Sequence, residues 1–113
     1  MSGTLYVVAT PIGNLDDLSP RARQTLAEAD LVAAEDTRHS GRLLSHIGAK
    51  PRLMAFHDHN ESEPVERLIV ELENGKSVAL ISDAGTPLVS DPGYRLVAAA
   101  HEHGIKVSPI PGA

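Results

Sequence analysis

Apolar residues gather in five short runs along the 113-residue chain, and a helix-like stretch separates each run from the next. The runs are mostly apolar and do not alternate with polar residues, which predicts strands buried on both faces. Strands of this kind, joined by helices, are typical of a mainly parallel sheet covered on both sides. We therefore predict a single α/β domain over residues 1–113, with a mainly parallel five-stranded sheet flanked by about four helices. The predicted strands are Thr4–Ala9, Leu31–Ala34, Arg52–Phe56, Ser77–Ile81 and Ile105–Ser108.

Four stretches between these strands carry helix signals. Ser19 followed by Pro20 is typical of an N-cap with proline at the first helical position. The third stretch has apolar residues at i, i+3, i+4 and i+7, which predicts one buried face. Glycine after the periodic residues favours a left-handed helix end. The predicted helices begin at Pro20, Thr37, the Asn60 to Ser62 region and Asp91, and the last three end near Ile47 before Gly48, at Gly75 and at Gly104.

The loops that leave the predicted strands are unusually rich in polar residues, glycine and proline. In a parallel sheet all of these loops lie along one edge, where ligands bind in open α/β folds. The turns that enter the strands, such as Asn74–Lys76, have plain turn compositions. This asymmetry favours a binding site at the exit edge, although glycine and proline can also simply mark turns. The exit loops are Thr10–Asn14, Glu35–Arg38, His57–Glu61, Ser82–Gly93 and Pro109–Ala113.

The loop Ser82–Gly93 has the strongest ligand-binding character. Its two glycines, two prolines and two aspartates predict a rigid backbone that a ligand can approach closely. Asp83 can bond a polar ligand group or the loop itself, whereas Asp91 before Pro92 is a typical helix N-cap. The sequence lacks the glycine-rich signatures of dinucleotide and P-loop phosphate sites. We therefore expect a ligand held in another way.

Two further exit loops contain candidate catalytic side chains. Glu35 and Asp36 precede Arg38, so a carboxylate here can act as a base, bind a hydroxyl or pair with arginine, and Asp36 can equally be a helix N-cap. His57 and His59 point to the same side if the chain is extended. Two ligands do not make a metal site, and we expect none, so His57 is better interpreted as a substrate contact or proton acceptor.

Charge is uneven along the chain, whose formal net charge is −5. Residues 1–56 contain six Lys/Arg and six Asp/Glu, whereas residues 57–113 contain four and nine. One Phe, two Tyr and no Trp offer little for base stacking. If RNA is the substrate, we therefore expect much of the phosphate contact to come from outside this chain. The lack of cysteine excludes disulfides and cysteine zinc sites, and the short apolar runs predict no membrane span.

Five motifs together, in this order and spacing, closely resemble the ribosomal RNA small subunit methyltransferase I family of the tetrapyrrole methylase superfamily. The first loop and the second and third motifs distinguish the chain from superfamily members that methylate corrinoid, sirohaem or diphthamide precursors. The motifs are Val8–Asp17, Ala34–Arg38, Phe56–Glu61, Asp83–Pro87 with Ser90–Gly93, and Pro109–Ala113.

This resemblance implies 2′-O-methylation of a cytidine in 16S ribosomal RNA of the small ribosomal subunit, in the cytoplasm, with S-adenosylmethionine as donor. It also implies a homodimer at full length and a donor site between two α/β domains. The chain ends at the expected interdomain joint, so we expect an N-terminal domain whose C-terminal partner is absent. By the same resemblance and the loop chemistry, the cofactor contacts are Pro11, Ile12, Asp83, Ala84, Gly85, Thr86, Val89 and Ala113.

On the substrate side we expect contacts from Glu35, Arg38, Asn60 and Glu61, with Asp36 or His57 as the catalytic base. Two other functions stay open at this point. One is a methylase of tetrapyrrole or corrinoid precursors. The other is a non-catalytic module that only binds ligand, dimerises or docks RNA, and we expect the isolated domain to be inactive.

Overall fold

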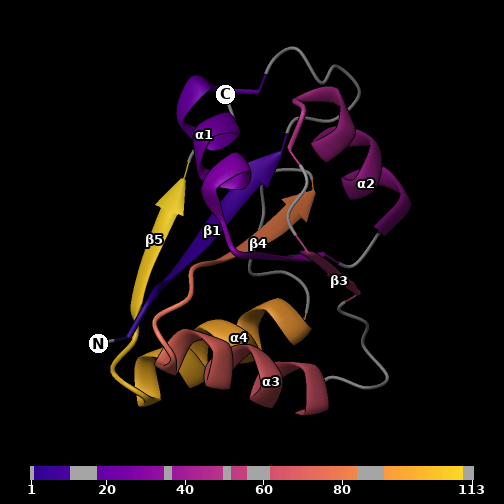
Figure 1. Cartoon of the computed structure of the whole chain (residues 1–113). Coiled ribbons are helices and arrows are strands. Elements are labelled where there is room, and N and C mark those ends of the chain that lie inside the picture. Colours follow the sequence, from indigo (N-terminus) through magenta and orange to yellow (C-terminus); the bar gives the residue numbers. More distant parts are fainter. Residues whose placement is uncertain are drawn as a thin grey trace.

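The computed structural model describes residues 2–10, 18–34, 37–49, 52–55, 62–83 and 91–110. In this part of the chain, five strands alternate with four helices, and the sheet lies between two pairs of helices (Figure 1). The predicted α/β class is thus confirmed. The elements are β1 (Thr4–Thr10), α1 (Pro20–Glu28), β2 (Leu31–Ala34), α2 (Thr37–His46), β3 (Arg52–Ala55), α3 (Ser62–Glu73), β4 (Val78–Asp83), α4 (Asp91–Glu102) and β5 (Lys106–Ile110).

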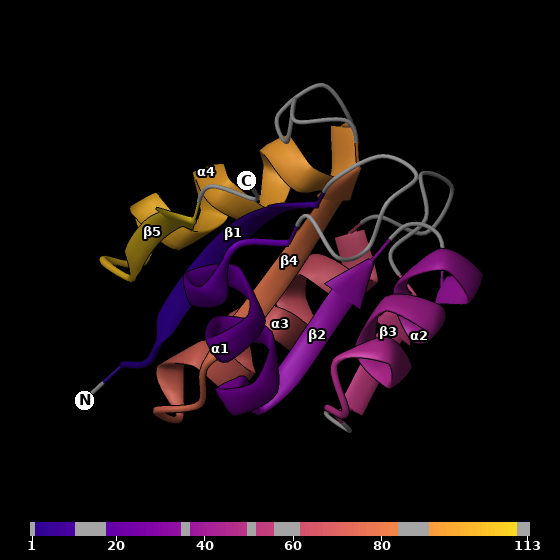
Figure 2. The ribbon, with the colours of Figure 1, turned by 90° about the horizontal axis from the view of Figure 1, so that it is seen from above.

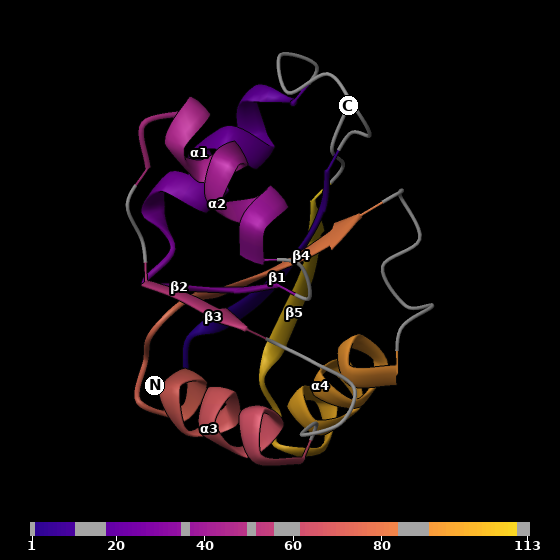
Figure 3. The same ribbon diagram turned by 90° about the vertical axis from the view of Figure 1, so that its right-hand side faces the viewer.

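The sheet has the strand order β3-β2-β4-β1-β5, and every neighbouring pair is parallel. The chain moves from β1 towards the β3 edge and then returns through β4 to β5. Right-handed crossovers in these two directions place their helices on opposite faces. Accordingly α1 and α2 cover one face, and α3 and α4 cover the other (Figure 3).

Each face of the sheet has its own hydrophobic core, because successive strand residues point to opposite sides. Leu31 and Ala33 of β2 pack with α3 and α4, whereas Val32 and Ala34 pack with α1 and α2. All four side chains are buried. Each continuous apolar run therefore contributes side chains to both hydrophobic cores, one on each face of the sheet.

The apolar stripe predicted for α3 is the buried face of that helix. Leu68 and Leu72 are fully buried, and Val65 and Ile69 are nearly so. Val70 follows Ile69 in the sequence but lies on the other side of the helix, and it is 54% exposed. The sequence spacing therefore predicts the orientation of α3 correctly.

Three of the four helices end at a glycine in the left-handed region. Gly48 follows α2 with φ 73°, and the next residue, Ala49, donates its N–H to the carbonyl of Leu44 at 2.9 Å. The same backbone pattern follows α3 at Gly75 and α4 at Gly104. These bonds satisfy carbonyls that a helix end leaves unpaired, and a side chain at the glycine positions would be strained.

The amino edge of the sheet is held by hydrogen bonds between turns. The N–H of Ser77 donates to Oδ2 of Asp30 at 2.9 Å, which joins the turn before β4 to the turn before β2. The N–H of Gly3 donates to the carbonyl of Leu72 at 2.7 Å. A Cβ at Gly3 would clash with the backbone carbonyl of Lys76, so this close approach requires glycine.

Three strands extend further than the sequence predicted. β1 reaches Thr10 and β4 reaches Asp83 because these two residues pair with each other. β5 reaches Ile110 through Pro109, which lies opposite Val7. Proline lacks an N–H to donate, but an edge strand tolerates it because one side of the strand is unpaired.

Other boundaries differ by one or a few residues. Ser77 and Ile105 precede β4 and β5, α2 ends one residue before Ile47, and α4 ends at Glu102. The predicted last residue of β3, Phe56, lies outside the described residues. Within the described ranges, no helix has the length and hydropathy needed to cross a bilayer.

Candidate functional site

The carboxyl ends of the strands meet at one edge because the sheet is fully parallel. Ala34, the last residue of β2, lies opposite Ile81, and Thr10 lies opposite Asp83. Both β1 and β4 therefore run two residues beyond the end of β2 along this edge. The two longest strands, side by side near the middle of the sheet, project furthest into the carboxyl edge.

The chain leaves these two neighbouring strands in opposite directions. β1 leads to α1 on one face, while β4 leads to α4 on the other (Figure 2). Adjacent strands whose helices lie on opposite faces form a topological switch point, which is where open α/β sheets bind ligands. The end of β1 at Thr10 and the end of β4 at Asp83 thus frame the candidate site.

All four helices also begin at this edge, since each follows the carboxyl end of a strand. Their first turns have N–H groups that the helix cannot pair internally and a partial positive charge. Ser19 caps α1 by accepting the N–H of Ala22 at 3.1 Å. The edge is therefore favourable for carboxylates and other electron-rich ligand groups.

Two of the sequence-predicted site residues fall in the described part of the chain. Asp83 was predicted in a loop but is the last residue of β4, because the pairing with Thr10 continues the strand. Arg38 is the second residue of α2 and is exposed. Asp83 therefore lies at the carboxyl edge at the end of β4, and Arg38 lies there in the first turn of α2.

The remaining predicted site residues lie outside the described residues, so their predicted roles stay predictions. The described strands that precede these residues in the sequence end at the carboxyl edge. They are Pro11, Ile12, Glu35, Asp36, His57, Asn60, Glu61, Ala84, Gly85, Thr86, Val89 and Ala113.

A metal site would need a cluster of His, Cys, Asp or Glu side chains. Among the residues with described positions, no three such side chains are grouped to hold an ion. His57 and His59 lie outside that set.

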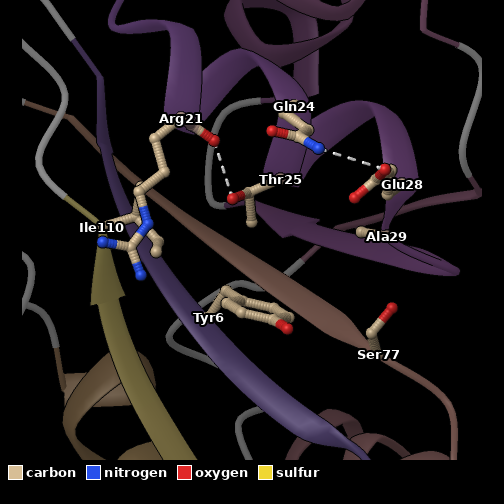
Figure 4. Close-up of a pocket in the computed structure, with 8 residues that line it drawn as sticks. All are labelled: Tyr6, Arg21, Gln24, Thr25, Glu28, Ala29, Ser77 and Ile110. Atoms are coloured by element: carbon tan, nitrogen blue, oxygen red, sulfur yellow. Dashed lines mark hydrogen bonds between the residues drawn. The ribbon is translucent and has the colours of Figure 1, made fainter.

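A pocket of about 410 Å³ lies away from this edge, between α1 and the strands β1 and β5 (Figure 4). The polar side chains of Arg21, Gln24 and Glu28 form its rim, and the ring of Tyr6 lies at its floor beside Ile110. Gln24 donates to Glu28 at 3.4 Å, so the rim is partly bonded to itself.

Sequence reasoning missed this pocket. Its signal is the spacing of Arg21, Gln24 and Glu28, which places three polar side chains on one flank of α1 next to its buried stripe. None of the sequence-predicted site residues is among the described residues that line it. The carboxyl edge remains the better candidate site, because the strand exits converge there.

The sequence matches a family model described as tetrapyrrole (corrin/porphyrin) methylases over residues 4–113. Curated relatives named ribosomal RNA small subunit methyltransferase I confirm the predicted resemblance. The relative from Haemophilus influenzae is 59% identical over the whole chain, and the one from Pseudomonas aeruginosa is 62% identical over 99% of it. The chain spans about 40% of the length of each of these relatives.

Solved structures of methyltransferases share the fold. A uroporphyrin-III-C-methyltransferase from Thermus thermophilus is 27% identical, with a TM-score of 0.77 over the whole chain and 49% of its own length. A cobalt precorrin-4 methyltransferase is 20% identical, with a TM-score of 0.80 over 97% of this chain and 46% of its own. The second likeness is one of fold alone.

Proposed function

Because the chain belongs to the tetrapyrrole (corrin/porphyrin) methylase family, we propose that it is the N-terminal domain of an enzyme that methylates ribosomal RNA. The reaction is transfer of a methyl group from S-adenosylmethionine to the 2′-oxygen of a cytidine in 16S ribosomal RNA. The observation that carries this proposal is the identity of 53–63% to relatives named ribosomal RNA small subunit methyltransferase I. A ribosomal substrate would place the enzyme in the cytoplasm.

The carboxyl edge is the proposed donor site. The described ends of β1 and β4 fit such a ligand, because the two strands project beyond β2 and their connections diverge. When bound, the donor supplies a methyl group on a positively charged sulfur. The residues proposed to hold it follow or end these strands and β5: Pro11, Ile12, Asp83, Ala84, Gly85, Thr86, Val89 and Ala113.

The RNA is proposed to enter on the side of β2 and β3. Glu35 and Arg38 come after β2 in the sequence, and Asn60 and Glu61 come after β3. Side chains from these two segments are proposed to orient the ribose. Orientation of this kind accounts for up to about 7–11 kcal/mol of the barrier in favourable cases. The segment after β3, together with the segment after β2 and the first turn of α2, would then contribute the residues that contact the acceptor.

A ribose hydroxyl is a weak nucleophile until it loses its proton. Asp36 and His57 are the proposed acceptors of that proton, because they follow the carboxyl ends of β2 and β3, the two strands on the proposed RNA side of the switch point. A positioned base contributes roughly 10²–10⁴-fold to the rate.

A second domain, in the part of the relatives' length that this chain does not span, is proposed to complete the donor site. The full-length protein is proposed to be a homodimer that acts on the small ribosomal subunit. Since the chain spans about 40% of its relatives, the isolated domain would lack half of the site and be inactive.

Methyl transfer by the full-length protein tests both the substrate and the base. We expect labelled methyl groups from S-adenosylmethionine to enter 30S subunits and not uroporphyrin III. Either Asp36→Asn or His57→Ala should lower turnover on 30S subunits by about 10²–10⁴-fold, since one of them removes the proton acceptor.

Matched substitutions at the end of α4 serve as controls. Glu102→Gln and His101→Ala likewise change a carboxylate and an imidazole, at exposed positions away from the carboxyl edge, and should keep normal turnover. Normal turnover in both Asp36→Asn and His57→Ala would exclude both as the base. Transfer to uroporphyrin or a corrinoid with none to RNA would instead favour the tetrapyrrole alternative.

A further inference from the structure

The sheet separates a cationic helical layer from an anionic one. Helices α1 and α2 together contain four arginines and one glutamate, a formal charge of +3. Helices α3 and α4 contain two arginines against five glutamates and one aspartate, a formal charge of −4. The two pairs of helices lie on opposite faces of the sheet (Figure 3), so the positive charge of the helices is concentrated in the α1 and α2 layer.

The positive charge of α2 lies on its outward side. Leu43 and Leu44 are buried against the sheet, whereas Arg38, Arg42 and His46 are exposed. The exposed three recur every four residues, which places them along one stripe of the helix surface. We call Arg38, Arg42 and His46 the α2 stripe.

No acidic residue offsets this stripe within its own helix. The ten residues of α2 include neither Asp nor Glu. The comparable outward side of α3 mixes the exposed Arg67 with the exposed Glu66 and Glu73. A solvated helix surface ordinarily carries both signs, as α3 does. The composition of α2 is therefore suited to a negatively charged partner.

The α2 stripe also begins at the candidate site. Arg38 follows the carboxyl end of β2 by four residues, and the helix then runs away from that edge. From Arg38 to His46 the stripe covers about 12 Å along the helix axis, at ~1.5 Å per residue. A polyanion bound along the stripe would have one end at the site. α1 lies beside α2 on the same face, and its exposed Arg23 adds to the positive field (Figure 2).

We propose that the α2 stripe binds the phosphate backbone of the RNA next to the methylated nucleotide, with the α3 and α4 layer turned away from the RNA. This inference rests on the proposed function. It means that this domain itself contacts some of the RNA phosphates, although its net charge is −5. Phosphate contacts by arginine fix the position of a nucleic acid without reading its sequence. The stripe therefore sets how the RNA enters the site.

The salt dependence of RNA binding by the full-length protein tests the proposal. Each lost phosphate contact should lower the slope of log K against log salt by about 0.7–0.9. Arg42→Gln should then weaken binding by about 5- to 8-fold at 0.1 M salt, and Arg38→Gln/Arg42→Gln by about 25- to 60-fold. Both differences should vanish on extrapolation to 1 M salt, and the KM for 30S subunits should rise more than kcat falls.

Arg67→Gln/Arg95→Gln removes two exposed arginines from the acidic layer and is the matched control. It should leave the slope, KM and kcat unchanged. Wild-type affinity and slope in Arg38→Gln/Arg42→Gln, or an equal loss in the control, would overturn the inference while methyl transfer to RNA by the wild type upholds the proposed function. Competition by polyglutamate as strong as that by RNA would point to an acidic protein segment and also overturn it. The single Arg42→Gln variant keeps the test valid if the double variant fails to fold.

Discussion

At the residue scale, Gly3 and Gly41 differ in whether the structure has room for a side chain. Gly3 lies against the turn after α3, and a Cβ there would lie 2.6 Å from the carbonyl carbon of Lys76. Gly41 lies inside α2, and the nearest atom to its Cβ would be Cδ2 of Leu53 at 3.9 Å, an ordinary contact. No local sequence pattern distinguishes these two glycines. Their roles could not be predicted because they depend on which distant residues pack against them.

The same substitution at these two positions should therefore have opposite effects. Gly3→Ala forces the backbone of two segments apart and should lower the free energy of unfolding by about 1–3 kcal/mol. Gly41→Ala reduces the backbone freedom of the unfolded chain and should raise the free energy of unfolding by about 0.5–1 kcal/mol. Urea denaturation of both variants measures this, and a destabilised Gly41→Ala with an unaffected Gly3→Ala would contradict the packing described.

At the scale of the elements, the sequence predicts type and order well because the core-facing residues follow simple periods. The third helix is predicted by the spacing of Val65, Leu68, Ile69 and Leu72, all of which are buried. The carboxyl ends of β1 and β4 were predicted too short, since Thr10 and Asp83 extend each other only once the two strands are paired. Pairing between strands distant in sequence is not encoded in local patterns, so strand ends were the least predictable feature.

The two sides of α3 give a direct check of its packing. Leu72→Ala leaves a cavity in the core shared by α3, α4 and the sheet, and should lower the free energy of unfolding by about 2–5 kcal/mol. Val70→Ala changes a side chain that is 54% exposed, so the free energy of unfolding should change by less than about 0.5 kcal/mol. Equal losses for the two variants, compared by urea denaturation, would mean that α3 is oriented otherwise.

At the scale of the whole molecule, the fold determines on which face of the sheet the charged helices lie. Along the sequence the acidic excess belongs to the second half, which argues against RNA binding by this chain. The fold places α1 and α2, with a formal charge of +3, on one face of the sheet and α3 and α4, with −4, on the other. The exit loops alone place the candidate site at the carboxyl edge, whereas the separation of the helical charges could be seen only once the topology was known.

We propose that the carboxyl edge of this sheet forms half of a methyl-transfer site for ribosomal RNA. Mass spectrometry of 16S ribosomal RNA, after treatment with the full-length protein and isotope-labelled S-adenosylmethionine, tests this proposal. We expect the label on the ribose 2′-oxygen of a cytidine. Label on a base, or RNA that stays unlabelled while a tetrapyrrole acceptor is methylated, would contradict the proposed 2′-O-methylation.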